Sequence, residues 1–336
     1  MQNGTIKALA VLLIIASFPQ FTAAQPAPTG PESAEWAVPR TSWGDPDISG
    51  AWPVDHLAHT PRERPPHMGT RTELTDEEYE QILRLAQRQI DWREQENEAN
   101  ILGMGHWIER GLPLRQTSLI VEPPNGRYPG LTAEGERLQA AQKTSWNNDT
   151  FNWMDDFGIF DRCITRGMPS SMLPGNYNSG IEVHQAPGLV AIKLEMIHET
   201  RLVYLDGRPP PPPEVTSWLG FSVGHWEGDT LVIETTNFTP GGSSGAVPNS
   251  AALKVTERLT PIGPDEMQYE ARLEDPVVLQ GPYTLAFPWR RQANYEQFEY
   301  ACHEGNYSIR NYITATGTRF AEQRARQGRG KDQTSE

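Results

Sequence analysis

The sequence is short of positive charge, and this shortage argues against two classes of partner. The 29 Lys and Arg residues face 43 Asp and Glu residues, which gives a formal net charge of -14 at pH 7. DNA, RNA and anionic membrane surfaces attract Lys and Arg, so we expect neither nucleic acid nor a lipid surface as partner. The acidic balance favours solubility and names no substrate.

Several common catalytic motifs are also missing. A zincin needs His-Glu-x-x-His, but the fifth residue of the stretch that begins at His303 is Tyr307. GGSSG at 241–245 has the letters of Gly-x-Ser-x-Gly, but it lacks the flanking strand and helix that a nucleophile elbow requires, so it is interpreted as a rim or lid loop. A Gly-rich phosphate loop is absent from the sequence as well. We therefore expect no transition metal and no diffusible cofactor, while scattered carboxylates leave a calcium site open.

Long apolar runs are rare, and the one at 8–18, ALAVLLIIASF, lies at the N-terminus after Lys7. It is too short to span a bilayer, and small residues follow it, which is typical of a secretory signal. We expect residues 1–24 to be a cleaved signal peptide and the mature protein to be secreted or periplasmic, without a membrane segment. Residues 25–42 are predicted to be a flexible lead-in, and 321–336 a disordered tail.

The chain has only two cysteines, Cys163 and Cys302. In an exported protein two cysteines usually pair, so we predict a disulfide between them. In the chain-entropy model, a bond that closes so long a loop contributes about 4–5 kcal/mol to stability. Two free thiols, or one catalytic thiolate, are the alternatives.

Residues 43–175 are predicted to be a helical and irregular segment. Thr75 and Glu78 form the pattern of a capping box, which predicts a helix from Thr75 that packs against the main body. One face of this helix carries its apolar residues: Tyr79, Ile82, Leu83, Ala86 and Ile90. A second helix is predicted over 132–142, and SLIVEPP at 118–124 predicts a short strand.

Short strands and tight turns dominate residues 176–320. Alternating segments flank turn residues at 187–188, 227–229 and 263–265, which predicts three hairpins. Together with TRLVYL, YTLAFPW and YEQFEYACH, these segments make about nine strands. The pattern favours a mainly β fold, an antiparallel barrel or sandwich, with the helical segment packed over one end.

Several sequence blocks resemble a widespread family of exported bacterial proteins. The blocks are DRCITRGMP, IHETRLVYLDGRP, GHWEGDTLVIETTNF and EYACHEGNY, and the resemblance spans most of residues 40–320. It implies a shared fold that is similar to lipocalin-like (calycin) barrels. The chain also looks like the group that contains extracellular, cofactor-independent enzymes that hydrolyse β-aryl ether bonds in lignin-derived dimers. This resemblance assigns no catalytic role to individual residues.

Acid–base groups lie in LVAIKLEMIHETR, residues 189–201. One strand face is apolar until His198, whereas the other carries Glu195. The two residues share a face only if the strand bends or bulges near Ile197. Arg201 could pair with a carboxylate or hold a substrate oxygen. The structural alternatives are a salt bridge for Glu195, a core or rim position for His198 and a solvated turn for Arg201.

A second candidate pair, His303 and Glu304, follows the cysteine at 302. Neighbouring residues of a strand point to opposite faces, so a disulfide that faces the helical cover would aim His303 into a barrel cavity. Arg162 and Arg166 flank the other cysteine, and the disulfide would bring both arginines to the same region.

These residues support a hypothesis of general acid–base catalysis on a small aromatic molecule. His198 and His303 would act as base or acid, Glu195 and Glu304 would orient them, and Arg201 would stabilise negative charge. The residues predicted to bind the substrate are Arg162, Tyr177, Trp218, Trp226 and Trp289.

The leading interpretation is an exported, cofactor-independent enzyme, and the resemblance favours hydrolysis of a β-aryl ether. A lyase or isomerase could use the same groups. A lipocalin-like carrier of hydrophobic ligands needs a pocket but can lack an acid–base pair, and a cell-envelope interaction protein needs no pocket. The sequence does not indicate an oligomeric state.

Overall fold

The computed structural model describes residues 36–321 except 104, 106–110, 112, 244 and 246, and it also describes residue 325. The chain divides into two units, residues 1–37 and 38–336, and the fold described below belongs to the second. The predicted signal peptide (1–24), the lead-in before residue 36 and most of the predicted tail (321–336) lie outside the described residues.

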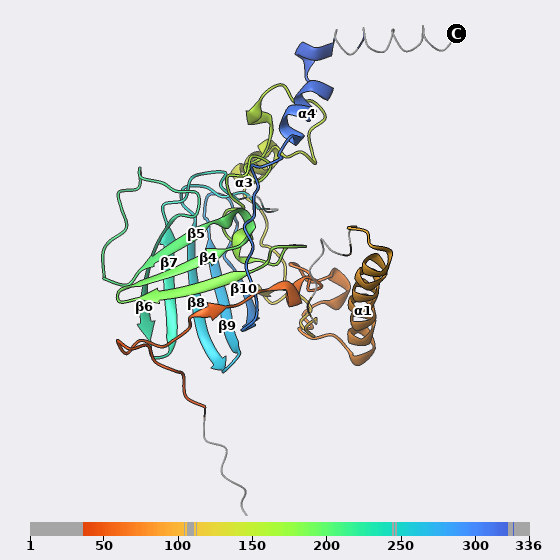
Figure 1. The fold of residues 1–336 in the computed structure, drawn as a ribbon. Helices are drawn as coiled ribbons and strands as arrows, with labels where there is room; N and C mark the ends of the chain where they lie inside the picture. The colour runs from red at the N-terminus through yellow and green to blue at the C-terminus, as the bar shows by residue number, and fades with distance from the viewer. Residues whose placement is uncertain are drawn as a thin grey trace, which may run out of the picture. The chain divides into compact units, whose positions relative to one another are not determined.

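The second unit is built on one ten-stranded sheet that curls into a half-barrel (Figure 1). The order of strands across the sheet is β1-β3-β4-β5-β6-β7-β8-β9-β10-β2. The mainly β, barrel-like fold predicted from the sequence is therefore confirmed. The strands are β1 (Gly50–Ala51), β2 (Ile120–Glu122), β3 (Ile181–Ala186), β4 (Leu189–Leu194), β5 (Thr200–Tyr204), β6 (Phe221–Glu227), β7 (Thr230–Thr236), β8 (Lys254–Gly263), β9 (Glu266–Glu274) and β10 (Tyr283–Arg290).

One pair of neighbouring strands departs from the predicted antiparallel pattern. β5 and β6 run parallel, with Val203 opposite Ser222, whereas the other paired strands are antiparallel. Parallel neighbours need a long connection that returns the chain to its starting edge, and residues 205–220 provide it. The three predicted hairpins are confirmed as β3–β4, β6–β7 and β8–β9.

The chain that follows β10 returns to β1, the far end of the strand order. The backbone N–H of Gln292 donates to the carbonyl of Ala51 at 3.1 Å, and Nη1 of Arg291 donates to the carbonyl of Ser49 at 2.6 Å. The guanidinium of Arg291 also lies 4.3 Å above the ring of Trp52. These contacts fasten the chain that follows β10 to β1, the strand at one edge of the curled sheet.

Alternating burial along the strands places the core inside the curl. In β4, Val190, Ile192 and Leu194 are buried, which confirms the apolar face predicted for this strand. Each fully buried side chain of this size stabilises the fold by about 1.5–3 kcal/mol. The interior also holds aromatic rings: Trp289 is fully buried and stacks on Tyr269, with 4.9 Å between ring centroids.

The predicted helix at Thr75 is confirmed as α1 (Asp76–Ala99), and its capping box with Glu78 is present. Its apolar face is only partly covered, because Ala86 is buried whereas Ile90 is 40% exposed. Two of the helix's contacts reach the segment that follows it: the Tyr79 hydroxyl donates to Pro113, and Arg93 donates to Gly105.

The second predicted helix is confirmed as α3 (Ala133–Ala141), and its N-cap, Thr132, joins it to the β9–β10 connection. The Thr132 hydroxyl donates to the carbonyl of Val277 at 2.5 Å. A third helix that the sequence did not predict, α4 (Ser308–Thr316), packs Ile313 against Phe151 and Phe157. The part of the chain that the structure describes also contains six 3-10 turns: Asp55–Leu57, Pro66–Met68, Met154–Asp156, Ser170–Met172, Met196–His198 and Thr318–Phe320.

Candidate functional site

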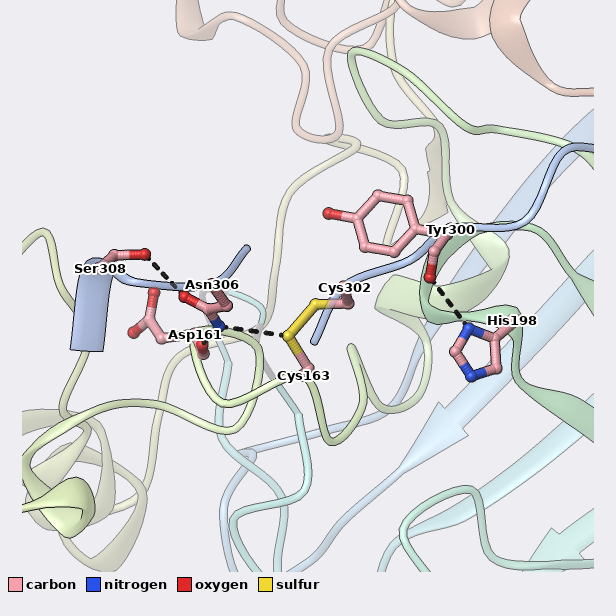
Figure 2. The surroundings of a disulfide bond; sticks show 7 residues. All are labelled: Asp161, Cys163, His198, Tyr300, Cys302, Asn306 and Ser308. Carbon is pink, nitrogen blue, oxygen red and sulfur yellow. Dashed lines mark hydrogen bonds between the residues drawn. A yellow bond between two sulfur atoms is a disulfide. The ribbon is translucent and has the colours of Figure 1, made fainter. Parts of the chain in front are cut away.

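The predicted disulfide between Cys163 and Cys302 is present and joins segments 139 residues apart in sequence. Nδ2 of Asn306 donates to the sulfur of Cys163 at 3.4 Å and to the carbonyl of Asp161 at 3.2 Å. Figure 2 shows Asn306 and Ser308 on one side of the bond and Tyr300 on the other. The disulfide therefore fastens the chain after β10 to the loop that carries Cys163.

Residues 295–303 were predicted to form a strand, and this prediction is wrong. The segment has no strand conformation, and His303 and Glu304 lie in an exposed turn beyond the disulfide. The proposed strand alternation therefore does not exist here, and the disulfide does not aim His303 into the barrel. No described contact brings either residue to the other candidates.

Glu195 and His198 separate at a break in the chain after β4. Ile197 has a φ of 61°, an uncommon conformation for a β-branched residue, so the chain does bend at this residue. Buried Glu195 accepts hydrogen bonds from the Tyr295 hydroxyl at 2.6 Å and from Nδ2 of Asn178 at 3.0 Å.

The exposed ring of His198 places Nδ1 3.0 Å from the carbonyl oxygen of Tyr300 (Figure 2). Because a carbonyl can only accept, Nδ1 is the donor in this bond. Glu195 and His198 both hold the segment after β10 in place, and the bend sends their side chains to different contacts.

Arg201 is neither solvated nor open to a ligand, because it lies inside the curled sheet. Its side chain is 1% exposed and pairs with Glu257, which is 0% exposed, through two guanidinium nitrogens at 2.9 and 2.5 Å. The Tyr269 hydroxyl donates to the same carboxylate at 2.9 Å. Of the roles considered for Arg201, pairing with a carboxylate is the one that is present, and the pair lies in the interior of the fold.

The three tryptophans expected to line a ligand pocket lie in different surroundings. Trp289 is a core side chain, as described above. Trp226 is half-buried against the core, and Trp218 is half-buried close to Gly242, where a Cβ would lie 3.3 Å from its ring. None of them lines the cavity described next.

A cavity with a volume of about 880 Å³ is walled by loops that converge from several parts of the chain. Two residues predicted to bind a ligand, Arg162 and Tyr177, line it. Met196, from the bend after β4, lies on the same wall. The rest of the lining comes from residues 57, 58, 60, 62, 119, 138, 141–144, 146, 155, 157–162, 166, 173–177, 241, 243 and 245.

Four cationic side chains line this cavity, and two of them are tied to aspartates. Nζ of Lys143 pairs with Asp156 at 2.8 Å, and Nη1 of Arg162 pairs with Asp155 at 2.8 Å. The other two cations that line it are Arg62 and Arg166, and the carboxylate of Glu199 lies close enough to Arg166 to interact with its charge. The sequence interpretation placed Arg166 in this region but missed Arg62, which lies in the Pro-rich stretch HTPRERPPH.

Arg166 is held in a poorly hydrated part of the wall. Burial, and then repulsion from Arg62, lowers the pKa of Arg166 to about 10, so the guanidinium stays charged at neutral pH. Nη1 of Arg166 donates to the carbonyl of Leu173 at 3.4 Å. A positive charge at low dielectric interacts more strongly with an incoming anion than the same charge in water.

Aromatic rings supply the apolar part of the wall. Tyr177 lies parallel to Tyr300, with ring centroids 6.4 Å apart and planes inclined by 5°. Burial, and then the neighbouring Tyr177, raises the pKa of Tyr300 to about 12, so its hydroxyl keeps its proton at neutral pH. Phe157, Phe160 and Trp146 also line the cavity, which therefore combines aromatic surface with fixed positive charge.

Among the described residues, no group of three or more His, Cys, Asp or Glu side chains is arranged to hold a metal ion. In the same part of the chain, no helix has the length and apolar character needed to cross a membrane. Comparison of the whole chain with protein-family models, with curated proteins and with solved structures finds no match.

Proposed function

We propose that the 880 Å³ cavity binds a small aromatic molecule. The observation that carries the proposal is the composition of its wall, in which Tyr177, Phe157 and Phe160 accompany convergent arginines. Ligand pockets have volumes of about 300–1,000 Å³ and combine apolar rings with a few placed polar groups. A lipocalin-like carrier of small ligands, secreted or periplasmic as the sequence predicts, would use the cavity in this way.

We add hydrolysis of a β-aryl ether as a second candidate, favoured by the charge of Arg166. Water would bond to the ether carbon, the carbon–oxygen bond would break, and the aryl oxygen would leave as a phenolate that Arg166 could stabilise. The water's proton needs a base, and His198 and His303 do not line the cavity. Asp155 lines it with a side chain that is 80% exposed, so Asp155 takes this role in the proposal.

Blocking the cavity tests the proposal of ligand binding. Ala141, the last residue of α3, lines the cavity and is exposed, whereas the neighbouring exposed Ala140 does not line it. Ala141→Trp should abolish the binding of guaiacylglycerol β-guaiacyl ether and of phenoxyacetate in isothermal titration calorimetry. Ala140→Trp, the matched control, should leave binding unchanged. Equal affinities in the two variants, or no binding of either ligand to the wild-type protein, contradict the proposal.

Hydrolysis is tested separately with the same ether dimer in isotopically labelled water. We expect the label in the alcohol product, since the water oxygen bonds to carbon, and none in the released phenol. Asp155→Asn should slow turnover by about 100-fold or more if the carboxylate accepts the proton. An unreacted dimer removes the hydrolysis candidate and leaves the binding proposal standing.

A further inference from the structure

One part of the cavity wall holds a cation that pairs with no carboxylate among the described residues. Arg62 lines the cavity, is half-buried and forms no ion pair with any described residue. Its guanidinium has five N–H donors, and the side-chain hydrogen bond described for it is a long one of 3.5 Å to the Tyr128 hydroxyl. Arg201, by contrast, forms an ion pair in which its Nη2 lies 2.5 Å from Oε2 of Glu257.

Two buried hydroxyls near Arg62 also lack a partner among the described residues. Thr60 lines the cavity, is 7% exposed, and its Oγ1 makes no hydrogen bond. Ser170 is 2% exposed, and its Oγ is likewise unpartnered. Most buried hydroxyls in proteins are hydrogen-bonded, because a buried hydroxyl without a partner is unfavourable.

Gly245 shows that Arg62 and Ser170 approach the same point of the cavity wall. A Cβ added there would lie 2.8 Å from Oγ of Ser170 and 3.3 Å from Nη1 of Arg62. Any side chain at residue 245 would therefore crowd the hydroxyl and the guanidinium. Arg166 adds a second positive charge close enough to repel Arg62. Unpaired hydroxyl donors and positively charged guanidinium groups thus lie in the same part of the wall. Such a combination favours the binding of an anion.

We infer that this wall binds the carboxylate of the aromatic ligand, with Arg62 as its main partner and the hydroxyls of Thr60 and Ser170 as further donors. The inference rests on the proposed function, because it names the chemical class of the same ligand. A guanidinium presents parallel N–H groups that match the two oxygens of a carboxylate. The ligand class is therefore an aromatic acid, and its ring would lie against the tyrosine and phenylalanine part of the wall.

The test compares phenoxyacetate with phenoxyacetamide, which has nearly the same shape but no charge, by isothermal titration calorimetry. The wild-type protein should bind the acid at least about 10-fold more tightly than the amide. Arg62→Gln should weaken binding of the acid by about 10-fold to 100-fold and change that of the amide by less than about 2-fold. Arg208→Gln is the matched control, since it removes the same charge from an exposed pair with Asp206.

Thr60→Val supplies a second, nearly isosteric variant. It should weaken binding of the acid by about 2-fold to 10-fold, while the melting temperature of the free protein stays unchanged or rises, because an unpaired hydroxyl is removed. Equal affinity for acid and amide, or equal losses for both in Arg62→Gln, overturns the carboxylate site and leaves the aromatic cavity standing. Failure of both ligands to bind the wild-type protein overturns the proposed function and the carboxylate site together.

Discussion

The buried pair of Arg201 and Glu257 provides the sharpest test of how this fold is stabilised. We consider Glu257→Gln, which keeps the size of the side chain and removes its charge. In the wild-type protein burial opposes the charge on Arg201, but the carboxylate of Glu257 more than offsets this and raises the pKa of Arg201. The variant would leave that positive charge inside the curled sheet, with Ser222 and Thr235 as its neutral neighbours.

The size of the effect follows from the burial of both partners. Removing one member of a buried ion pair costs about 3–5 kcal/mol, because the other charge remains desolvated. Typical domains unfold at a cost of about 5–15 kcal/mol, so Glu257→Gln would remove a large share of the stability. Tyr269→Phe deletes one hydrogen bond to the same carboxylate and should cost about 1.5–3 kcal/mol.

Urea denaturation, followed by tryptophan fluorescence with the disulfide intact, measures these differences. The matched control is Glu274→Gln, because Glu274 and Arg272 form a pair in which both side chains are more than 40% exposed. That variant should unfold at the wild-type urea concentration. Replacing both buried partners, Arg201→Met with Glu257→Leu, should recover most of the loss. The reasoning is refuted if Glu257→Gln is no less stable than Glu274→Gln.

Two further predictions concern the disulfide and a buried histidine. Replacing Cys163 and Cys302 by serine should lower the unfolding free energy by about 3–5 kcal/mol in guanidinium, and a loss below about 1 kcal/mol contradicts this. Burial lowers the pKa of His56 from 6.5, so below pH 6.5 the unfolded chain binds a proton that the folded chain does not. His56 therefore does not reduce the free energy of unfolding above about pH 6.5, and below that pH it lowers this free energy progressively as the pH drops. His56→Gln should flatten that fall between about pH 7 and 5, and an identical slope in both proteins refutes the assignment.

The parts of the fold that could be predicted are those fixed by local chemistry. The capping box at Thr75 depends on residues three positions apart, and the hairpin at 187–188 depends on a Pro-Gly turn between alternating segments. The parallel pairing of β5 with β6 could not be predicted in the same way. It depends on where the long connection at 205–220 returns the chain, and no local pattern specifies that path.

The segment after β10 shows why alternation alone can mislead. YEQFEYACH has a strand-like pattern, but Phe298 is 71% exposed, so the alternation does not mark a buried face. Its polar groups form hydrogen bonds with side chains and not with a neighbouring strand. Nδ1 of His198 donates to the carbonyl of Tyr300, and the Tyr295 hydroxyl donates to the carboxylate of Glu195. A strand forms only where another strand can pair with it, and this condition is set by the whole fold.

Arginine is the residue type for which the sequence and the structure differ most in this protein. Arg201 lies in a strand beside acid–base groups and was a candidate for holding a substrate, while Arg62 lies in a stretch that reads as irregular. In the structure Arg201 forms an ion pair with Glu257, which lies 56 residues away in sequence, and so it is not available to a ligand. Arg62 forms no ion pair with a carboxylate among the described residues. Whether a buried cation is neutralised depends on long-range partners, and so a binding arginine can be separated from a structural one only after the chain has folded.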